Sequence, residues 1–373
     1  MKSFLFLLLS LFCIRTYARP PEVPLVEAKA YAVIDYNSGQ TIAESGVEKR
    51  IEPGSLTKLM TAYVVFGALK QKMLKMEQQI PVSDLAVGVK GSRMFLEQKK
   101  PATAGDLVKG MIVESANDAC VALAEGIAGS EKAFTERMNE EAKRLGMQDT
   151  HFANATGLAG PDHYTTVKDL SILASSIVRD YPEYLPFFAG KEYTYNGVTQ
   201  PNRNRLLWMD PHADGLGTGH TEASGYCLVA SVLRGNRRLI SVLAGARSDS
   251  GRAIESLKLL NYALQYYDSV RLYSKGQAVT TLRVWKGRKN TLKAGFSRDL
   301  YVTVPKGEES GLRAVIEARQ PLVVPVMAGQ QVGVVQVSLE GRRLAEFPLI
   351  SLENVESANF FGRAWDGIKL LFN

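Results

Sequence analysis

Apolar residues recur at helical spacing along most of the first two thirds of the chain. This pattern predicts helices over residues 55–70, 104–113, 117–127, 131–145, 167–179 and 252–267. The first predicted helix is apolar on most of its sides, which is typical of a helix in the centre of a domain. Pairs of apolar stretches joined by short turns predict hairpins within residues 30–43 and 225–245.

The pattern changes after residue 267, where apolar and polar residues alternate in short stretches. Strands are predicted there at residues 279–285, 299–304, 312–318, 331–339 and 342–349, with turn residues between them. A chain of 373 residues is also too long for one typical domain. We therefore predict a domain of helices and strands over residues 19–268, followed by a small all-β domain over residues 269–355.

The two ends of the chain have patterns of their own. Residues 1–18 combine Lys2, an apolar run and the small residues Thr16 and Ala18, as in a cleaved secretory signal. The apolar run is too short to span a bilayer, so a signal is preferred to a transmembrane helix. Residues 356–373 predict an amphipathic helix that anchors the protein to a membrane surface. The alternative is a terminal helix that packs on the β domain.

Composition narrows the class of partner. Removal of the signal takes away Lys2 and Arg15, so the net charge falls by two, from +7 to +5. The remaining basic residues are spread along the chain and do not alternate with aromatic residues, so we expect no nucleic-acid partner. Cys120 and Cys227 remain after cleavage. Because both lie in apolar runs, buried thiols are favoured over a disulfide.

The first candidate for chemistry is Ser55, which is followed by Lys58 three residues later. On a helix this spacing places the amine and the hydroxyl on the same face. Burial lowers the pKa of an amine, and a neutral amine accepts the proton of a serine nucleophile. The Ser-x-x-Lys pattern is short, however, and a serine at the start of a helix is often only an N-cap.

Two more motifs follow along the chain. Residues 115–117 read Ser-Ala-Asn and lie between two predicted helices, where they either cap the second helix or bring a hydroxyl and an amide to Ser55. Residues 217–219 read Gly-Thr-Gly just before a predicted apolar strand, either as a glycine-rich turn or as a segment that contacts a substrate. The spacing of a dinucleotide-binding G-x-G-x-x-G motif fails at this point.

In this order, the three motifs resemble the Ser-x-x-Lys, Ser-x-Asn and Lys-Thr-Gly signature of penicillin-binding proteins and serine β-lactamases. Residues 53–61, 114–120, 151–158 and 219–226 are similar in particular to the low-molecular-mass D-alanyl-D-alanine carboxypeptidases. The resemblance covers essentially the whole mature chain. It implies a β-lactamase/transpeptidase-like α+β domain, with an antiparallel sheet, helices on its faces and a helical subdomain, before the all-β domain.

The resemblance also implies roles for individual residues. Ser55 is the residue acylated by substrate or by a β-lactam antibiotic, Lys58 is its general base, and Ser115 completes the proton path. The residues implied to hold the substrate are Asn117, Arg203, Gly217, Thr218, Gly219, His220 and Arg252. The backbone amides of Ser55 and His220 form the implied oxyanion hole.

The implied substrate is the peptidoglycan pentapeptide stem that ends in D-Ala-D-Ala, from which the terminal D-Ala is removed without a metal or cofactor. The same resemblance implies a periplasmic protein, peripherally anchored to the outer face of the bacterial inner membrane through its C-terminal helix. We expect the β domain to hold the active site away from the lipid.

Gly217 departs from the pattern, because the family has lysine at this position and glycine carries no charge. The lysine helps to bind the substrate carboxylate. Losing a positioned electrostatic group of this kind lowers activity by on the order of 10²–10³. Either the chain is impaired, by natural or engineered change, or Arg252 or another cation replaces the lysine.

Other functions remain open at this point. A non-catalytic peptidoglycan-binding scaffold of the same fold is one, and covalent capture of labelled penicillin distinguishes it from an enzyme. A serine β-lactamase is less favoured, because no Glu-x-x-Asn segment lies between Thr150 and Asp169. A zinc peptidase is disfavoured because the histidines form no H-E-x-x-H or similar cluster.

Overall fold

The computed structural model describes residues 20–360 and 366 of the chain. These residues form two compact units. The N-terminal unit consists of Val23–Gln265 with Leu300–Thr303, and the C-terminal unit consists mainly of Tyr266–Asp299 and the residues from 304 onward. The predicted signal and most of the predicted anchor helix lie outside the described residues.

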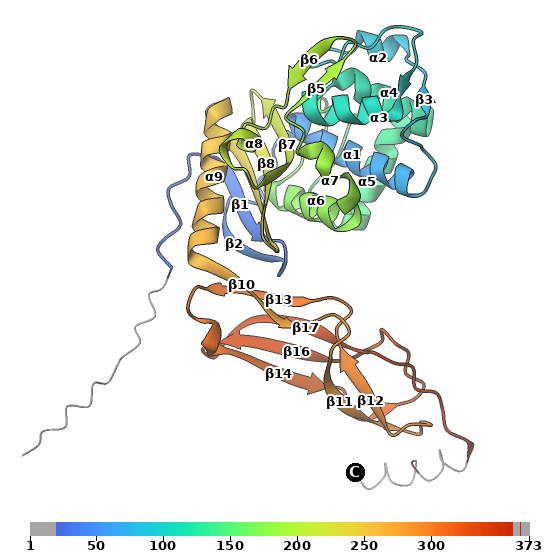
Figure 1. Cartoon of the computed structure of the whole chain (residues 1–373), viewed down its shortest axis with the longest axis vertical. Coiled ribbons are helices and arrows are strands. Elements are labelled where there is room, and N and C mark those ends of the chain that lie inside the picture. The colour runs from blue at the N-terminus through green and yellow to red at the C-terminus, as the bar shows by residue number, and fades with distance from the viewer. Residues whose placement is uncertain (1–19, 361–365, 367–373) are drawn as a thin grey trace, which may run out of the picture. The chain divides into compact units, whose positions relative to one another are not determined.

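A five-stranded antiparallel sheet forms the centre of the N-terminal unit, with strand order β2-β1-β9-β8-β7 (Figure 1). Its strands are β1 (Ala30–Asp35), β2 (Gln40–Ser45), β7 (Ala213–Thr221), β8 (Gly225–Arg234) and β9 (Arg237–Ala246). Helix α6 covers one face of the sheet and α9 lies along the other, which is why β8 and β9 are buried along most of their length. Strand β7 forms one edge.

Helices pack around this sheet, most of them on the side of α6, with α9 on the opposite face. The helices are α1 (Thr57–Lys70), α2 (Asp84–Gly88), α3 (Ala104–Lys109), α4 (Asn117–Ala128), α5 (Glu131–Leu145), α6 (Val167–Asp180), α7 (Leu185–Phe188), α8 (Leu206–Met209) and α9 (Asp249–Tyr266). Two short ribbons accompany them, β3 (Gln79–Ile80) with β4 (Ala102–Thr103) and β5 (Glu192–Tyr195) with β6 (Val198–Pro201).

Helix α1 lies at the centre of the helices on the α6 side and packs against α4, α5 and α6. Twelve of its 14 residues are buried, which confirms the central helix predicted from its apolar residues. A 3₁₀ turn, Gly54–Leu56, leads directly into it. This turn carries Ser55, and the first turn of α1 carries Lys58.

Two local predictions are wrong. The helix predicted over residues 104–113 ends as an α-helix at Lys109 and continues as a π-helical turn, Gly110–Glu114. Of the two alternatives for residues 217–219, the glycine-rich turn is wrong, because these residues lie inside strand β7. Glycines and a threonine are typical of a turn, but here the glycines allow the strand to approach other backbone closely.

The C-terminal unit is built of strands. Its main sheet has the order β14-β16-β17-β12-β11-β15. These strands are β11 (Ala278–Trp285), β12 (Thr291–Gly295), β14 (Leu312–Ala318), β15 (Leu322–Val323), β16 (Gln331–Leu339) and β17 (Arg342–Ser351). Strands β10 (Tyr267–Tyr273) and β13 (Leu300–Pro305) form a separate two-stranded sheet, and the first four residues of β13 are counted with the N-terminal unit. The alternating pattern therefore predicted the β class correctly but missed β10, β12 and β15.

Cys120 and Cys227 are both buried free thiols, as predicted from their apolar surroundings. Burial raises the pKa of the Cys120 thiol to about 12, so this thiol stays protonated and inert. Among residues 20–360 and 366, no helix combines the length and the apolar character that a membrane span requires.

Candidate active site

The hydroxyl of Ser55 and the amine of Lys58 lie within hydrogen-bond distance of one another. The Lys58 Nζ donates to Ser55 Oγ at 3.1 Å and to the backbone oxygen of Thr156 at 2.6 Å. Ser55 makes no capping hydrogen bond to α1, so the simple N-cap interpretation of this serine is wrong. The pair has the geometry of a nucleophile and its base.

The amine of Lys58 is held in a buried position, since this residue is only 6% exposed. Burial lowers the pKa of Lys58, and the nearby positive charge of Arg203 lowers it further. Cys120 and Asp118 act in the opposite direction. Since burial is the largest of these effects, the structure favours the neutral amine that a general base requires.

Two glycines allow the Ser55 turn to pack tightly between neighbouring segments. A Cβ atom on Gly157 would lie 1.9 Å from the backbone oxygen of Gly54, and a Cβ on Gly219 would lie 2.6 Å from the backbone oxygen of Pro53. Gly157 also has a φ of +85°, which side-chain-bearing residues rarely adopt. Backbone packing against glycine therefore fixes the position of Ser55 from two sides.

The loop that carries Gly157 is shaped by one asparagine. Asn154 Oδ1 accepts hydrogen bonds from the backbone nitrogens of Thr156 and Gly157, at 3.1 and 2.7 Å, and from the Thr156 hydroxyl at 2.9 Å. This turn aims the Thr156 carbonyl at Lys58. Sequence reasoning assigned no role to Thr156, because a backbone carbonyl leaves no signature in residue types; the only signal was the similarity of residues 151–158 to the family.

Ser115 enters the site from the end of the π-helical turn. Its φ of 59° takes the chain out of the helix, and its side chain lines the same hollow as Ser55 and Lys58. Neither Ser115 nor Asn117 caps α4, whose N-cap is Ala116 without a side-chain hydrogen bond. The capping interpretation of this motif is therefore wrong, and the Ser115 side chain lines both the hollow and the open cleft.

The side chain of Asn117 is half satisfied. Its Nδ2 donates to the backbone oxygen of Lys90 at 2.7 Å, whereas its buried Oδ1 accepts no hydrogen bond from any residue that the structure describes. A buried unpaired acceptor is uncommon. Next to Ser115, it is suited to an N–H group of a bound peptide.

Strand β7 contributes its residues alternately to α1 and to the open cleft. A Cβ on Gly217 would lie 3.2 Å from Leu59 Cδ2, so this position faces α1. A hollow of about 20 Å³ lies there, large enough for one water molecule. Thr218 lines both this hollow and the open cleft. The backbone of His220 lies against the Ser55 turn, with its nitrogen 3.2 Å from a Cβ placed on Gly54.

The two candidate arginines differ in how freely they can act. Arg252 is buried, and its guanidinium donates to the backbone oxygens of Gly219 at 3.0 Å and Cys227 at 3.3 Å and pairs with Asp249. Arg203 is exposed and lines the cleft, and its guanidinium forms no ion pair or hydrogen bond with another residue of the described chain. Arg203 is therefore the cation available to a ligand.

Together these residues surround a cleft of about 630 Å³, which is within the range of small-molecule and peptide sites. The residues that line it include Ser55, Ser92, Ser115, Arg203, Trp208, Thr218, Gly219, His220, Tyr226 and Arg252. Lys58 and Gly217 line only the small hollow behind this cleft, and Asn117 lines neither of the two. In the described residues, no three His, Cys, Asp or Glu side chains gather in a way that would hold a metal ion.

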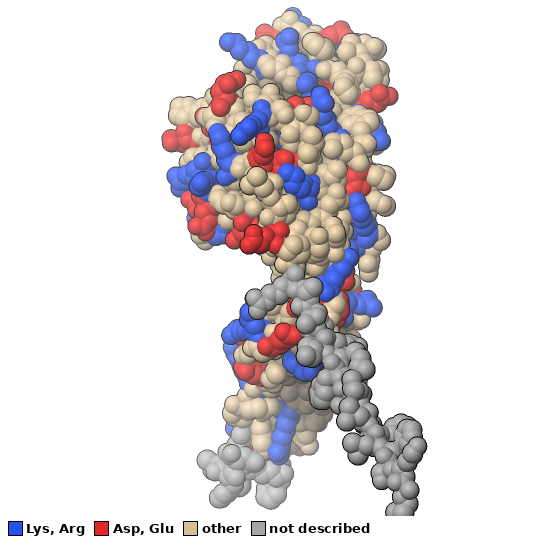
Figure 2. All heavy atoms as spheres, turned by 90° about the vertical axis from the view of Figure 1, so that its left-hand side faces the viewer, with Lys and Arg blue, Asp and Glu red and all other residues tan. Residues whose placement is uncertain are grey.

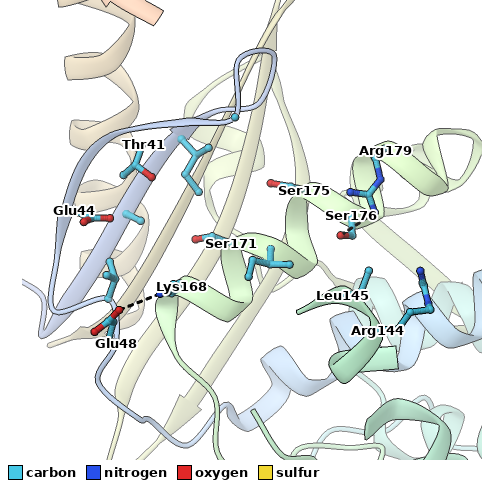
Figure 3. Close-up of a pocket in the computed structure, with 15 residues that line it drawn as sticks. Thr41, Glu44, Glu48, Arg144, Leu145, Lys168, Ser171, Ser175, Ser176 and Arg179 are labelled. Carbon is cyan, nitrogen blue, oxygen red and sulfur yellow. Dashed lines mark hydrogen bonds and ion pairs between the residues drawn. The ribbon is translucent and has the colours of Figure 1, made fainter. Parts of the chain in front are cut away.

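A second hollow, of about 610 Å³, lies between β2 and α6 (Figure 3). Its cations are already paired: Lys168 with Glu48 at 3.0 Å, Arg144 with Glu141, and Arg179 with Asp180. It holds no pair of nucleophile and base comparable to Ser55 and Lys58. On the face of the N-terminal unit shown in Figure 2, cations and anions are likewise interspersed.

Comparison with known proteins gives the same assignment for both units. Residues 16–248 match the family described as D-alanyl-D-alanine carboxypeptidase, and residues 267–357 match the family described as Penicillin-binding protein 5, C-terminal domain. The chain is 39% identical over 360 residues to D-alanyl-D-alanine carboxypeptidase DacC of Escherichia coli (strain K12), covering 94% of this chain and 90% of that protein.

Solved structures are similar as well. Penicillin binding protein 5 from Haemophilus influenzae has a TM-score of 0.85 and 37% identity, with 90% of this chain and 99% of that chain covered. Penicillin-Binding Protein D2 from Listeria monocytogenes in the ampicillin-bound form has a TM-score of 0.59 and 32% identity. That match covers 64% of this chain and 98% of the Listeria chain.

We predict that Gly157→Ala lowers the rate of Ser55 labelling by a fluorescent penicillin by about 10²-fold, since misplacing a reacting group by ~1 Å has an effect of this size. The added methyl cannot fit beside the Gly54 carbonyl, so the Ser55 turn must move. Gly160→Ala is the matched control in the same loop, because its Cβ would meet nothing closer than 3.6 Å. Equal labelling rates in the two variants would show that this packing does not position Ser55.

Proposed function

The chain belongs to the D-alanyl-D-alanine carboxypeptidase family and is a serine-type carboxypeptidase, and from that premise we propose how its own residues carry the reaction. Ser55 is the nucleophile and Lys58 its general base. The observation that carries this assignment is the hydrogen bond of 3.1 Å between Lys58 Nζ and Ser55 Oγ, made by a buried amine of lowered pKa. The substrate is the peptidoglycan stem peptide that ends in D-Ala-D-Ala.

The acylation step follows from these positions. Ser55 Oγ attacks the carbonyl carbon of the penultimate D-Ala while its proton passes to Lys58 Nζ. When the peptide bond breaks, the proton moves through the Ser115 hydroxyl to the amine of the terminal D-Ala, which leaves. Water then attacks the resulting ester, a proton returns along the same path, and the shortened peptide is released with Ser55 restored.

The remaining residues hold the peptide and the developing charge. We assign the backbone amides of Ser55 and His220 to the carbonyl oxygen, because the His220 nitrogen lies beside the Ser55 turn. The free Oδ1 of Asn117 accepts a peptide N–H. Strand β7 is an edge strand, so the peptide extends the sheet along the segment of Thr218 and Gly219.

Ser55 is predicted to be the only residue acylated by a β-lactam, because it alone has a buried amine within hydrogen-bond distance at this site. Mass spectrometry of the penicillin adduct identifies the labelled peptide. Ser55→Ala abolishes the adduct. An adduct on Ser115, or labelling that persists in Ser55→Ala, would contradict the assignment. Binding of muropeptide without any adduct would instead favour a non-catalytic scaffold of the same fold.

Gly217 is the position at which this chain departs from its family. We propose that the missing cation weakens binding of the substrate carboxylate. Arg203 is a better substitute than Arg252, because Arg252 is bound to strand carbonyls and Asp249, whereas Arg203 is exposed to the cleft. The charge of Arg203 already acts on the Lys58 amine.

Gly217→Lys is predicted to raise the rate of D-Ala release by on the order of 10²-fold, through the restored positive charge. A Cβ at this position requires Leu59 to move by a few tenths of an ångström, which the end of a flexible side chain allows. Gly217→Ala is the control, because it adds the same Cβ beside Leu59 without a charge and is expected to give no gain. If Gly217→Lys leaves the rate unchanged, another cation already supplies this charge, with Arg203 as the residue to test next.

We further propose that the protein is periplasmic and peripherally anchored to the outer face of the inner membrane through residues 356–373. The amphipathic pattern of this segment supports the proposal. One contact supports the alternative of a helix packed on the β domain: Asp366 Oδ2 accepts a hydrogen bond of 2.7 Å from the backbone nitrogen of Lys286. The other residues from 361 onward lie outside the described part of the chain.

Deletion of residues 359–373 tests the anchor. The truncated protein is expected to stay in the soluble fraction with an unchanged rate of Ser55 labelling, since the active site lies in the N-terminal unit. Asp366→Ala is the control: it removes the contact with Lys286 but keeps the apolar face, so this variant is expected to remain with membranes. Sedimentation of the truncated form with membranes would refute the anchor.

A further inference from the structure

Glu114 is a buried acid at the edge of the active site. It is the last residue of the π-helical turn, immediately before Ser115, and it is only 1% exposed. Its Oε2 accepts a hydrogen bond of 2.7 Å from Gln200 Nε2, whereas its Oε1 is buried without a hydrogen-bond partner among the described residues. Neither the mechanism above nor the similarity to the family gives this carboxyl a role.

Glu114 lies where several segments that line the cleft meet. The Gln200 Nε2 that binds Glu114 also donates to the backbone oxygen of Arg93 at 2.9 Å. Gln200 belongs to β6, three residues before Arg203. The backbone oxygen of Ser92, next to Arg93, accepts from the backbone nitrogen of Asn117 at 2.7 Å. One carboxyl therefore connects the Ser115 segment with the strand that leads to Arg203.

Burial, with the charges around it, raises the pKa of Glu114 toward neutral pH. Burial and the neighbouring carboxylate of Asp118 raise the pKa of Glu114 to about 7, while the guanidinium of Arg203 acts in the opposite direction. The elements packed against the π-helical turn are α1, α3, α4, α7, β5 and β6. The titratable or charged residues of these elements, with Arg203 after β6, are Lys58, Tyr63, Lys70, Asp106, Lys109, Asp118, Cys120, Glu125, Glu192, Tyr193, Tyr195 and Arg203. Asp118 and Arg203 are the two of them whose charges act on the pKa of Glu114. Tyr193 stays neutral, because burial raises its pKa above the ordinary range.

We propose that Glu114 is a positioning residue whose protonation state decides whether Arg203 serves the substrate. The inference rests on the proposed function, in which Arg203 is the free cation that faces the substrate carboxylate. Neutral Glu114 accepts a hydrogen bond from Gln200 and does not attract Arg203, so the Arg203 guanidinium can bind the substrate carboxylate. Ionised Glu114 has an unpaired oxygen and a full negative charge in a buried site, and the nearby Arg203 is the cation that compensates it.

The neutral form of Glu114 is therefore the active one. As the pH rises through about 7, the ionised carboxylate competes with the substrate carboxylate for Arg203. This competition affects substrate binding more strongly in this chain than in its relatives, because Gly217 replaces the lysine that the family has on β7. Two effects then act on the acylation rate as the pH rises. Deprotonation of Lys58 increases the rate, and ionisation of Glu114 decreases it.

The test compares the wild type with Glu114→Gln, which keeps the shape of the neutral acid and cannot ionise. The rate of Ser55 labelling by a fluorescent penicillin, itself a carboxylate, is measured between about pH 5.5 and pH 8.5, on either side of the neutral range. The titration of Lys58 affects both proteins alike, so the ratio of the two rates isolates Glu114. The ratio of variant to wild type is expected to rise about fivefold with pH, the factor that a partly exposed ion pair contributes.

Glu125→Gln is the matched control, because it removes one carboxylate from the far end of α4 without touching the cleft. Its rate ratio to wild type is expected to stay flat. A flat ratio for Glu114→Gln, with Ser55 efficiently labelled, would overturn the role of Glu114 and leave the proposed function standing. Absence of labelling at every pH would overturn the proposed function and this inference together.

Thermal unfolding provides a second measurement that does not depend on catalysis. Glu114 has a raised pKa in the folded state, so the stability that its neutral form contributes is fully present below the ordinary value of 4.5 and is lost as the pH rises from there to about 7. The melting temperature of wild type is expected to fall across this interval relative to Glu114→Gln. Parallel curves for the two proteins would show that Glu114 does not titrate there.

A third variant keeps the acid and changes its partner. Gln200→Met removes the amide that donates to Glu114 Oε2, and loss of this donor raises the pKa of the acid further. The alkaline fall in the labelling rate is expected to move to higher pH. A fall at the same pH as in wild type would overturn the link between Gln200, Glu114 and the cleft.

Discussion

The burial of the Lys58 amine is the constraint on which the rest of the active site depends. An ammonium in this position would lose its hydration shell and have only two hydrogen-bond acceptors, Ser55 Oγ and the Thr156 carbonyl, for its three N–H groups. The site therefore favours the neutral amine and with it an activated serine. Both acceptors are held by backbone, one by the 3₁₀ turn before α1 and the other by the loop that Asn154 shapes. The chemistry of the pair is thus a property of the packing around it.

Two charged residues near the Ser55–Lys58 pair shift the pKa of Lys58 in opposite directions. Asp118 favours the charged form of Lys58, and Arg203 disfavours it. The same two residues act on Glu114, again in opposite directions. Asp118 is fixed, because its oxygens accept from the backbone nitrogens of Met94 and Leu96, whereas Arg203 is exposed and free to move. Arg203 is therefore the adjustable charge of the site, and a ligand that carries a carboxylate competes for it.

The sequence predicted those parts of the fold in which side-chain pattern and burial coincide. Helix α1 was predicted because apolar residues surround it, and the Ser55–Lys58 pair because the 3₁₀ turn that carries Ser55 leads directly into this helix. Strand β7 was missed, because its glycines serve close backbone contacts and look like a turn. Thr156 and Glu114 were missed for other reasons: one acts through its carbonyl, and the other is a polar residue whose burial depends on β6 folding over it.

Gly217 removes a positive charge from the site without disturbing the packing around it. The position faces α1, its nearest neighbour is the flexible end of Leu59, and it lines a hollow sufficient for one water molecule. Gly157 and Gly219, in contrast, contact backbone atoms that cannot move without displacing Ser55. Loss of a charge at position 217 is thus compatible with an intact fold and an intact nucleophile. Arg203 is then the cation that binds the substrate carboxylate, and the ionisation state of Glu114 decides whether it is available.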